Sequence, residues 1–130
     1  MATGVLLITH AGIGTAMLAV ARGLLRNLPL RVEAFEVPFD GDLDALLPQA
    51  SAALRRVDDG DGVLLLTDLY GASPSNLAAR VARLGTPVRS VSALSLPMLL
   101  RVLNYAELDL QALPAVAAAG ARNGVVHDQG

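Results

Sequence analysis

The stretch GVLLITHAGIG, residues 4–14, decides the fold that this sequence predicts. Its apolar run Val5–Thr9 is bounded by glycines, a pattern typical of a β-strand that is buried on both faces. From Gly14 onward the apolar residues recur at i, i+3, i+4 and i+7, which predicts a helix that reaches Leu28 and stops at Pro29. A buried strand followed by a helix is the repeating unit of an α/β protein.

The rest of the chain repeats this alternation of short apolar runs and helical spacing. Ser73-Pro74 is the clearest helix start, with the serine hydroxyl as the N-cap and the proline in the first helical position. The predicted strands are Leu30–Val37, Val63–Thr67 and Pro87–Val91, with a last short strand at Gly124–Val126, and the predicted helices are 43–57, 73–84, 97–105 and 108–119.

Strands that alternate with helices predict an α/β domain with a small, doubly wound, mostly parallel sheet. Right-handed crossovers place helices on both faces of this sheet. The favoured strand order is 2-1-3-4, which sets the first and third strands side by side, with their carboxyl ends where such sheets bind ligands. A length of 130 residues and a hydrophobic content of 53% fit one domain, residues 1–130, with a well-buried core.

The composition excludes several classes of protein. Lys+Arg total 10 against 12 Asp+Glu, and the basic residues are scattered, which argues against a nucleic-acid binder. The chain has no cysteine and only the histidines His10 and His127, so we expect no disulfide, no cysteine nucleophile and no metal site. No apolar run reaches the roughly 18 residues of a membrane span, and no signal peptide is evident, so we expect a cytoplasmic protein without membrane insertion.

Two chemically competent side chains follow the two strands that are predicted to be neighbours. His10 follows the first strand and Asp68 follows the third, so their loops face each other across strands roughly 5 Å apart. A carboxylate that bonds one ring nitrogen fixes the histidine tautomer and leaves a lone pair on the other nitrogen. We therefore predict His10 as a nucleophile and Asp68 as the group that orients it.

The two glycine-containing loops lead into helix N-termini, which makes them an anion site that suits phosphate. Together with a nucleophilic imidazole, such a site indicates phosphohistidine chemistry. The residues predicted to hold the phosphoryl group are Ser73, Thr9, Gly71 and Ala72, with Thr15 and Ser75 as further hydroxyl donors.

Alternative interpretations of these residues stay open at this point. Ser73 also serves as a helix cap, and Asp68 is equally suited to bonding loop amides. Tyr70 is either an exposed residue that contacts a partner protein or an ordinary half-buried tyrosine. A dinucleotide-binding interpretation of the glycines after His10, with Glu36 as the ribose acid, is weak because Met17 stands where the third glycine belongs.

Three motifs close the first, third and fourth predicted strands: Thr9-His10, then Asp68-x-x-Gly71-x-Ser73-Pro74-x-Asn76, then Leu96-Pro97-Met98-Leu99. In order and spacing they resemble the enzyme IIA component of the mannose family of the phosphoenolpyruvate:sugar phosphotransferase system. The resemblance covers nearly the whole chain, and the segment from Asp68 to Asn76 is its most specific part.

The resemblance implies that the histidine-phosphorylated carrier protein HPr phosphorylates His10 on Nε2. The phosphoryl group then passes to a IIB protein or serves as a regulatory signal on another enzyme. Asp68 would bond the Nδ1 side of the ring, and Ser73 would hold phosphoryl oxygens; no cofactor is implied. The family fold adds an antiparallel edge strand, for which Gly124–Val126 is the candidate, within the chain or exchanged with a partner subunit of a homodimer.

Departures from the family pattern are small. Ala11 and Ile13 stand where relatives often carry glycine or bulkier polar residues, and Tyr70 replaces a tryptophan of an enteric relative. No Ala/Pro-rich linker or IIB domain follows, so we expect a free-standing A component. The alternatives are the phosphotransfer subunit of a dihydroxyacetone kinase, which the Gly71-to-Asn76 pattern disfavours, and a non-catalytic module that binds a small anion or a nucleotide.

Overall fold

The computed structural model describes residues 2–129 as alternating strands and helices. In chain order these elements are β1 (Gly4–His10), α1 (Gly14–Leu25), β2 (Val32–Val37), α2 (Leu43–Val57), β3 (Val63–Thr67), α3 (Ser73–Val81), β4 (Val88–Val91), α4 (Leu96–Asn104) and α5 (Leu113–Asn123).

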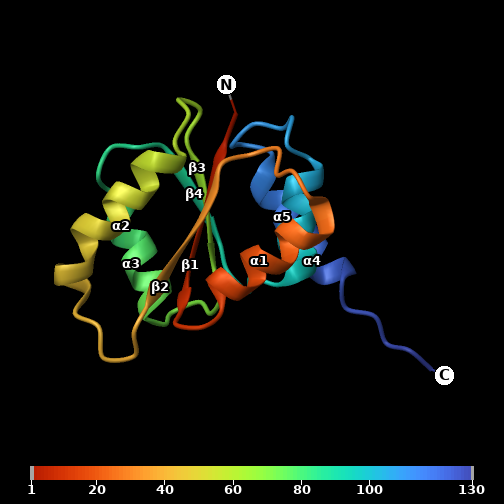
Figure 1. The fold of residues 1–130 in the computed structure, drawn as a ribbon, viewed down its shortest axis with the longest axis horizontal. Helices are drawn as coiled ribbons and strands as arrows, with labels where there is room; N and C mark the ends of the chain where they lie inside the picture. Colours follow the sequence, from red (N-terminus) through yellow and green to blue (C-terminus); the bar gives the residue numbers. More distant parts are fainter. Residues whose placement is uncertain (1, 130) are drawn as a thin grey trace.

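The strands form one parallel sheet in the order β2-β1-β3-β4, which confirms the predicted topology. The register pairs His10 at the end of β1 with Val37 at the end of β2, and pairs Ile8 with Thr67 at the end of β3. The loops that follow these three strands therefore gather at one edge of the sheet, at the bottom of Figure 1. This edge carries His10 and Asp68.

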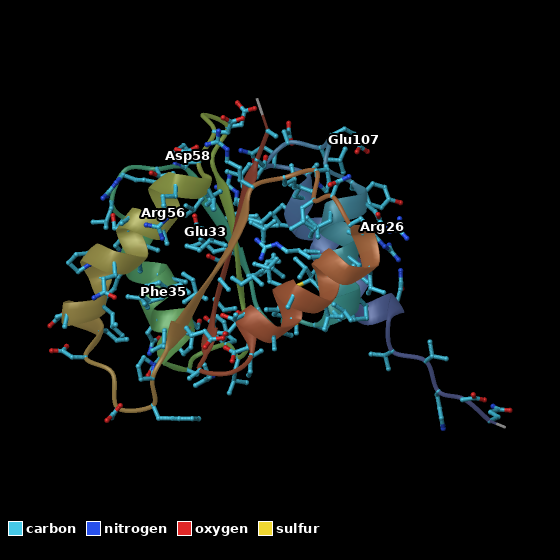
Figure 2. All side chains as sticks on the ribbon, in the orientation of Figure 1. Arg26, Glu33, Phe35, Arg56, Asp58 and Glu107 are labelled. Carbon is cyan, nitrogen blue, oxygen red and sulfur yellow. The ribbon has the colours of Figure 1, made fainter. Side chains whose placement is uncertain are left out.

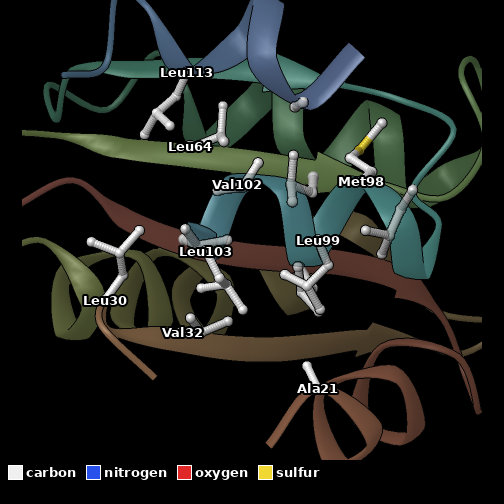
Figure 3. Close-up of a cluster of buried hydrophobic side chains, with 14 of the residues drawn as sticks. Ala21, Leu30, Val32, Leu64, Met98, Leu99, Val102, Leu103 and Leu113 are labelled. Atoms are coloured by element: carbon white, nitrogen blue, oxygen red, sulfur yellow. The ribbon is translucent and has the colours of Figure 1, made fainter. Parts of the chain in front are cut away.

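Two cores hold the helices on the sheet, and β1 contributes to both because successive strand side chains point to opposite faces. Val5 and Leu7 pack into a core with α1, α4 and α5, which lie on one side of the sheet in Figure 1. Figure 3 shows the leucine-rich centre of this core. Leu6 and Ile8 pack into the other core with α2 and α3. These four side chains of β1 are fully buried. Their burial fixes the position of the strand that ends in His10.

A surface ion pair ties α2 to the edge strand β2. Arg56 donates from Nε to both carboxylate oxygens of Glu33 at 3.1 Å and from Nη2 at 2.9 Å. Figure 2 shows the two side chains beside each other, away from the edge that carries His10. Because both side chains are partly exposed, we expect this ion pair to contribute little to stability.

Four predicted helix boundaries are wrong, and two of them have a clear local reason. Helix α3 ends at Val81 rather than Leu84, and α5 ends at Asn123 rather than Ala119. The first helix ends at Leu25 rather than Leu28 because Arg26 adopts a positive φ of 63°, which turns the chain out of the helix. The last helix begins at Leu113 rather than Leu108, which places Pro114 in the first helical turn, where its missing amide hydrogen costs no hydrogen bond.

The predicted strand at Gly124–Val126 is not formed in this chain. Helix α5 continues to Asn123, and Gly124 lies so close to Pro97 that an added Cβ would stand 2.5 Å from the proline Cβ. The chain therefore leaves from the face that α4 and α5 cover, not from a free edge of the sheet, and Figure 1 shows it leading away. Val125 and Val126 are each 80% exposed. Among residues 2–129, no helix combines the length and apolar character needed to cross a membrane.

The second core gives a direct test of the fold. Leu65 in β3 is fully buried among α2 and α3, so Leu65→Ala should lower the free energy of unfolding by about 2–5 kcal/mol, measured by chemical denaturation. The matched control is Leu84→Ala, whose side chain is mostly exposed and whose removal should change stability by less than about 0.5 kcal/mol. Equal effects of the two substitutions would contradict this packing.

Candidate active site

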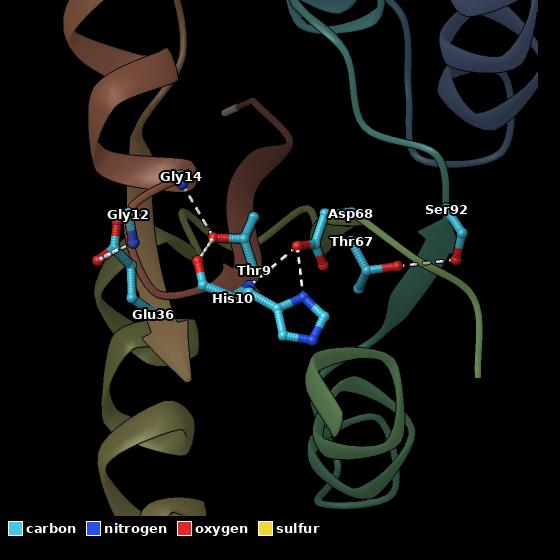
Figure 4. A network of polar contacts seen from close by, with 8 residues as sticks. All are labelled: Thr9, His10, Gly12, Gly14, Glu36, Thr67, Asp68 and Ser92. Carbon is cyan, nitrogen blue, oxygen red and sulfur yellow. Dashed lines mark hydrogen bonds and ion pairs between the residues drawn. The ribbon is translucent and has the colours of Figure 1, made fainter. Parts of the chain in front are cut away.

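One carboxylate oxygen of Asp68 binds His10 twice. Oδ2 lies 2.7 Å from the ring nitrogen Nδ1 and accepts the backbone N–H of His10 at 3.0 Å (Figure 4). The parallel pairing of β1 with β3 produces this contact, because Thr67 lies opposite Ile8, so Asp68, one residue later, and His10, two residues later, lie at the same edge of the sheet. The predicted meeting of these two side chains is therefore present in the structure.

The electrostatics of the pair fix the histidine tautomer. Burial raises the pKa of Asp68, but the hydrogen bonds from the His10 backbone and ring, with the charge of the ring, outweigh burial and lower the pKa below its usual value. Asp68 is therefore a carboxylate, which only accepts hydrogen bonds, so Nδ1 carries the hydrogen in the neutral ring. Nε2 is left with its lone pair on the far side of the ring from Asp68 (Figure 4).

The second carboxylate oxygen of Asp68 has no such support. Oδ1 is buried and accepts no hydrogen bond within residues 2–129. A buried charge is costly unless it is paired. The charged form of Asp68 is therefore stabilised by the backbone N–H and the ring of His10. A positive charge that develops on the imidazole is therefore favoured at this position.

Thr9 and Glu36 hold the loop that follows His10. The Thr9 hydroxyl donates to the His10 carbonyl and accepts the N–H of Gly14, both at 2.9 Å, while the threonine itself is fully buried. Glu36 on β2 accepts the N–H of Gly12 and the N–H of Thr15, both at 3.0 Å, and these hydrogen bonds lower its pKa, with the Gly12 bond the largest cause.

These contacts change the roles expected of the residues near α1. Thr9 lies beneath the loop with its hydroxyl engaged, so we revise its role from phosphate contact to loop support. The Glu36 carboxylate already occupies the amides of Gly12, just before α1, and of Thr15, in its first turn, where a dinucleotide phosphate would bind. Thr15 is engaged by the same carboxylate.

The start of α3 remains free to receive an anion. The N-cap is Ala72 rather than the predicted Ser73, and its N–H bonds the carbonyl of Leu69 at 3.3 Å, so Ala72 offers no amide. Ser73 is the first helical residue and is exposed, and its hydroxyl and its N–H have no partner within residues 2–129. Gly71 is exposed with a φ of +87°, and in the part of the chain that the structure describes neither its N–H nor that of Ser75, in the first turn of α3, has a partner.

Sequence reasoning missed Phe39, the aromatic residue beside the histidine. Its ring stacks on the His10 ring at a centroid distance of 5.5 Å and an interplanar angle of 29°. A signal was present, because the second strand is predicted to end at Val37, beside the strand that His10 follows, and Phe39 comes two residues later. Ile13, on the loop after β1, and Leu69 and Tyr70, on the loop after β3, are further exposed hydrophobic residues. Tyr70 is 84% exposed and is therefore not the half-buried residue of the alternative interpretation.

The chain also matches a described protein family. Residues 4–119 match the EIIA-man family, the PTS system fructose IIA component. The chain belongs to this family. Membership of EIIA-man gives it a phosphotransfer role in a sugar phosphotransferase system or in regulation linked to one.

Solved structures share the fold of this EIIA-man chain, and one curated protein shares part of its sequence. The fold matches a mannose/sorbose-specific IIA subunit from Enterococcus faecalis with a TM-score of 0.85 and 21% identity, over 99% of this chain and 96% of that one. It matches a phosphotransferase system component EIIA from Streptococcus agalactiae with a TM-score of 0.82 and 19% identity, over 96% of each chain. The transcriptional regulatory protein LevR of Bacillus subtilis (strain 168) is 28% identical over 115 residues, which are 85% of this chain but only 12% of LevR.

The lowered pKa of Asp68 predicts how its contribution to stability depends on pH. A carboxylate with a lowered folded-state pKa stabilises the folded protein above its unfolded-state pKa of about 3.9 and loses that effect as the pH falls through the folded-state value. We expect Asp68→Asn to be less stable than the wild type at neutral pH, with a difference that shrinks at acidic pH in denaturant titrations. Asp61→Asn, in the exposed turn before β3, is the control. A difference that is the same at all pH values would contradict the assignment.

The contact of Glu36 with two amides predicts local protection from exchange. Glu36→Gln retains a single side-chain oxygen, so amide hydrogen exchange at Gly12 and Thr15 should accelerate by up to about tenfold, the worth of one net hydrogen bond. Glu33→Gln removes a charge from the same strand but not from this loop, and it should leave both amides unchanged. Exchange that is insensitive to Glu36→Gln would show that the carboxylate does not hold the loop.

Proposed function

We propose that this protein is a phosphocarrier that accepts a phosphoryl group from histidine-phosphorylated HPr on Nε2 of His10. It then passes the group to a IIB protein or uses its phosphorylation state as a regulatory signal. The observation that carries the proposal is the bond from Nδ1 to the Asp68 carboxylate, which leaves Nε2 as the free nucleophile. In this proposal, the phosphoryl oxygens bind the free donors at the start of α3.

The proposed step follows from the state of the ring. The lone pair of Nε2 attacks the phosphorus atom in line, the new N–P bond forms, and the P–N bond to the donor histidine breaks with its electron pair moving to the donor ring. The His10 ring gains positive charge, which the adjacent Asp68 carboxylate stabilises. No proton has to leave Nδ1, because Asp68 accepts that hydrogen bond throughout.

The phosphoryl oxygens find donors at α3 in this proposal. Ser73 offers its hydroxyl and its N–H, Gly71 and Ser75 offer N–H groups, and the helix N-terminus favours negative charge. These contacts position the group and offset its charge, which is the main task of a protein in phosphoryl transfer.

Partner proteins would dock around the mouth of the site. The exposed apolar residues Ile13, Leu69 and Tyr70 lie on loops that follow β1 and β3, and they suit a transient interface with modest affinity. A homodimer is part of the proposal on the family resemblance alone. The similarity to a segment of LevR favours regulation as the second candidate role, because that relative is named as a transcriptional regulatory protein.

Labelling from phosphoenolpyruvate tests the proposal. With enzyme I, HPr and labelled phosphoenolpyruvate, we expect the wild type to gain an acid-labile, base-stable phosphate, and His10→Ala to lose at least nine-tenths of it, since Nε2 of His10 is the acceptor. His127→Ala, which alters the other histidine in the exposed C-terminal segment, should label like the wild type. Equal labelling of His10→Ala, or none of the wild type, would refute the proposed function.

A further inference from the structure

Phe39 occupies a position that burial does not explain. Its ring is 86% exposed, whereas the other phenylalanine, Phe35, packs against the core shared with α2 and α3. Phe39 lies in a tight turn that is closed by the bond from the Gly41 N–H to the Pro38 carbonyl at 3.0 Å. Such a turn favours polar residues, so the fold itself does not require an aromatic ring here.

The sheet register carries this turn to the histidine. Val37 pairs with His10, and its carbonyl accepts the N–H of Ala11 at 3.2 Å, so the end of β2 is fixed against the end of β1. The turn begins with the next residue and sets the ring of Phe39 on the imidazole, at a centroid distance within the 4.5–7 Å range of favourable aromatic pairs. The exposed ring thus has a specific partner.

The stacking geometry leaves the nucleophile open. The Phe39 ring stacks on a face of the imidazole, while the lone pair of Nε2 lies in the plane of the imidazole and points away from Asp68. The bond from Nδ1 to Asp68 fixes one point of the imidazole, but a ring held at one point can still tilt. A second ring on its face limits this tilt and keeps Nε2 on the line of attack.

We propose that Phe39 is a positioning residue for phosphoryl transfer at His10. This inference rests on the part of the proposed function that makes His10 the phosphoryl acceptor. The imidazole becomes positively charged when the Nε2–P bond forms, and the electron-rich face of an aromatic ring attracts such a charge. For an exposed ring, this attraction corresponds to a factor of roughly two to five in rate or equilibrium.

A small phosphoryl donor separates positioning from protein docking. Phosphoramidate can phosphorylate a histidine directly: Nε2 attacks phosphorus, the N–P bond to His10 forms, and the P–N bond to the amine breaks, so that ammonia leaves after taking up a proton from water. No partner protein takes part, so the rate reports on the imidazole and its surroundings alone.

The test compares three variants with the wild type. Phe39→Leu keeps an apolar side chain but removes the aromatic face, so we expect phosphorylation of His10 by phosphoramidate to slow by about two- to five-fold. Phe39→Tyr should restore the wild-type rate. Tyr105→Leu, which removes a partly exposed aromatic residue at the end of α4, is the matched control and should react like the wild type. In proton spectra, the loss of the Phe39 ring should also shift the signals of the His10 ring, whereas Tyr105→Leu should not.

The outcomes are distinct from those of the labelling experiment. If Phe39→Leu matches the wild type with phosphoramidate and is slower only with HPr, Phe39 merely contacts the partner and the inference is overturned. Failure of phosphoramidate to label His10 in the wild type would overturn it as well. If phosphoramidate labels His10 with the expected variant pattern but HPr does not, the donor assignment in the proposed function fails and the positioning role of Phe39 stands.

Discussion

A single carboxylate oxygen joins the two halves of the site. Asp68 Oδ2 accepts both the backbone N–H and the ring Nδ1–H of His10, so the ends of β1 and β3 are tied at the point where the sheet opens to solvent. Because the other oxygen of the carboxylate is buried and has no partner among residues 2–129, the charge of Asp68 is stabilised mainly from the side of the imidazole. The tautomer of the ring, the direction of its free nitrogen and its tolerance of positive charge all depend on this contact.

The fold explains why such a contact is possible between residues that lie 58 positions apart. Parallel strands end at the same edge, and β1 is buried on both faces, so neither its register nor its depth can change without exposing apolar side chains. The two cores therefore act as the scaffold of the site. Functional residues often lie on loops that a rigid scaffold of this kind positions.

Much of this arrangement could be predicted from the sequence because it rests on patterns with one physical solution. Fully apolar runs such as Val63–Thr67 gave correct strands, and the position of His10 and Asp68 after neighbouring strands followed from the strand order. Contacts set by backbone detail could not be predicted in the same way. The hydroxyl of Thr9 points inward, and the cap of α3 falls on Ala72 instead of Ser73, because amide directions in the loops decide both, and no residue pattern encodes them.

Phe39 and Gly124–Val126 are two further cases in which the residue pattern did not predict the contact. Phe39 lies in a turn whose composition indicates only a change of direction, and its contact with His10 depends on the closure of that turn. Gly124–Val126 has the composition of a strand. Because α5 continues to Asn123, however, this segment begins beside α4 and not at an edge of the sheet. In both cases the deciding factor is where the preceding element ends.

The hydrogen bonds from the Gly12 and Thr15 amides to Glu36 have a consequence for ligand selectivity. Cells contain abundant free nucleotides and dinucleotides, and many folds with this topology capture them through the very amides that Glu36 fills here. A nucleotide phosphate could bind these amides only if it displaced the Glu36 carboxylate from them. Phosphate binding at the start of α1 would therefore cost both hydrogen bonds of Glu36, whereas the amides at the start of α3 carry no such cost.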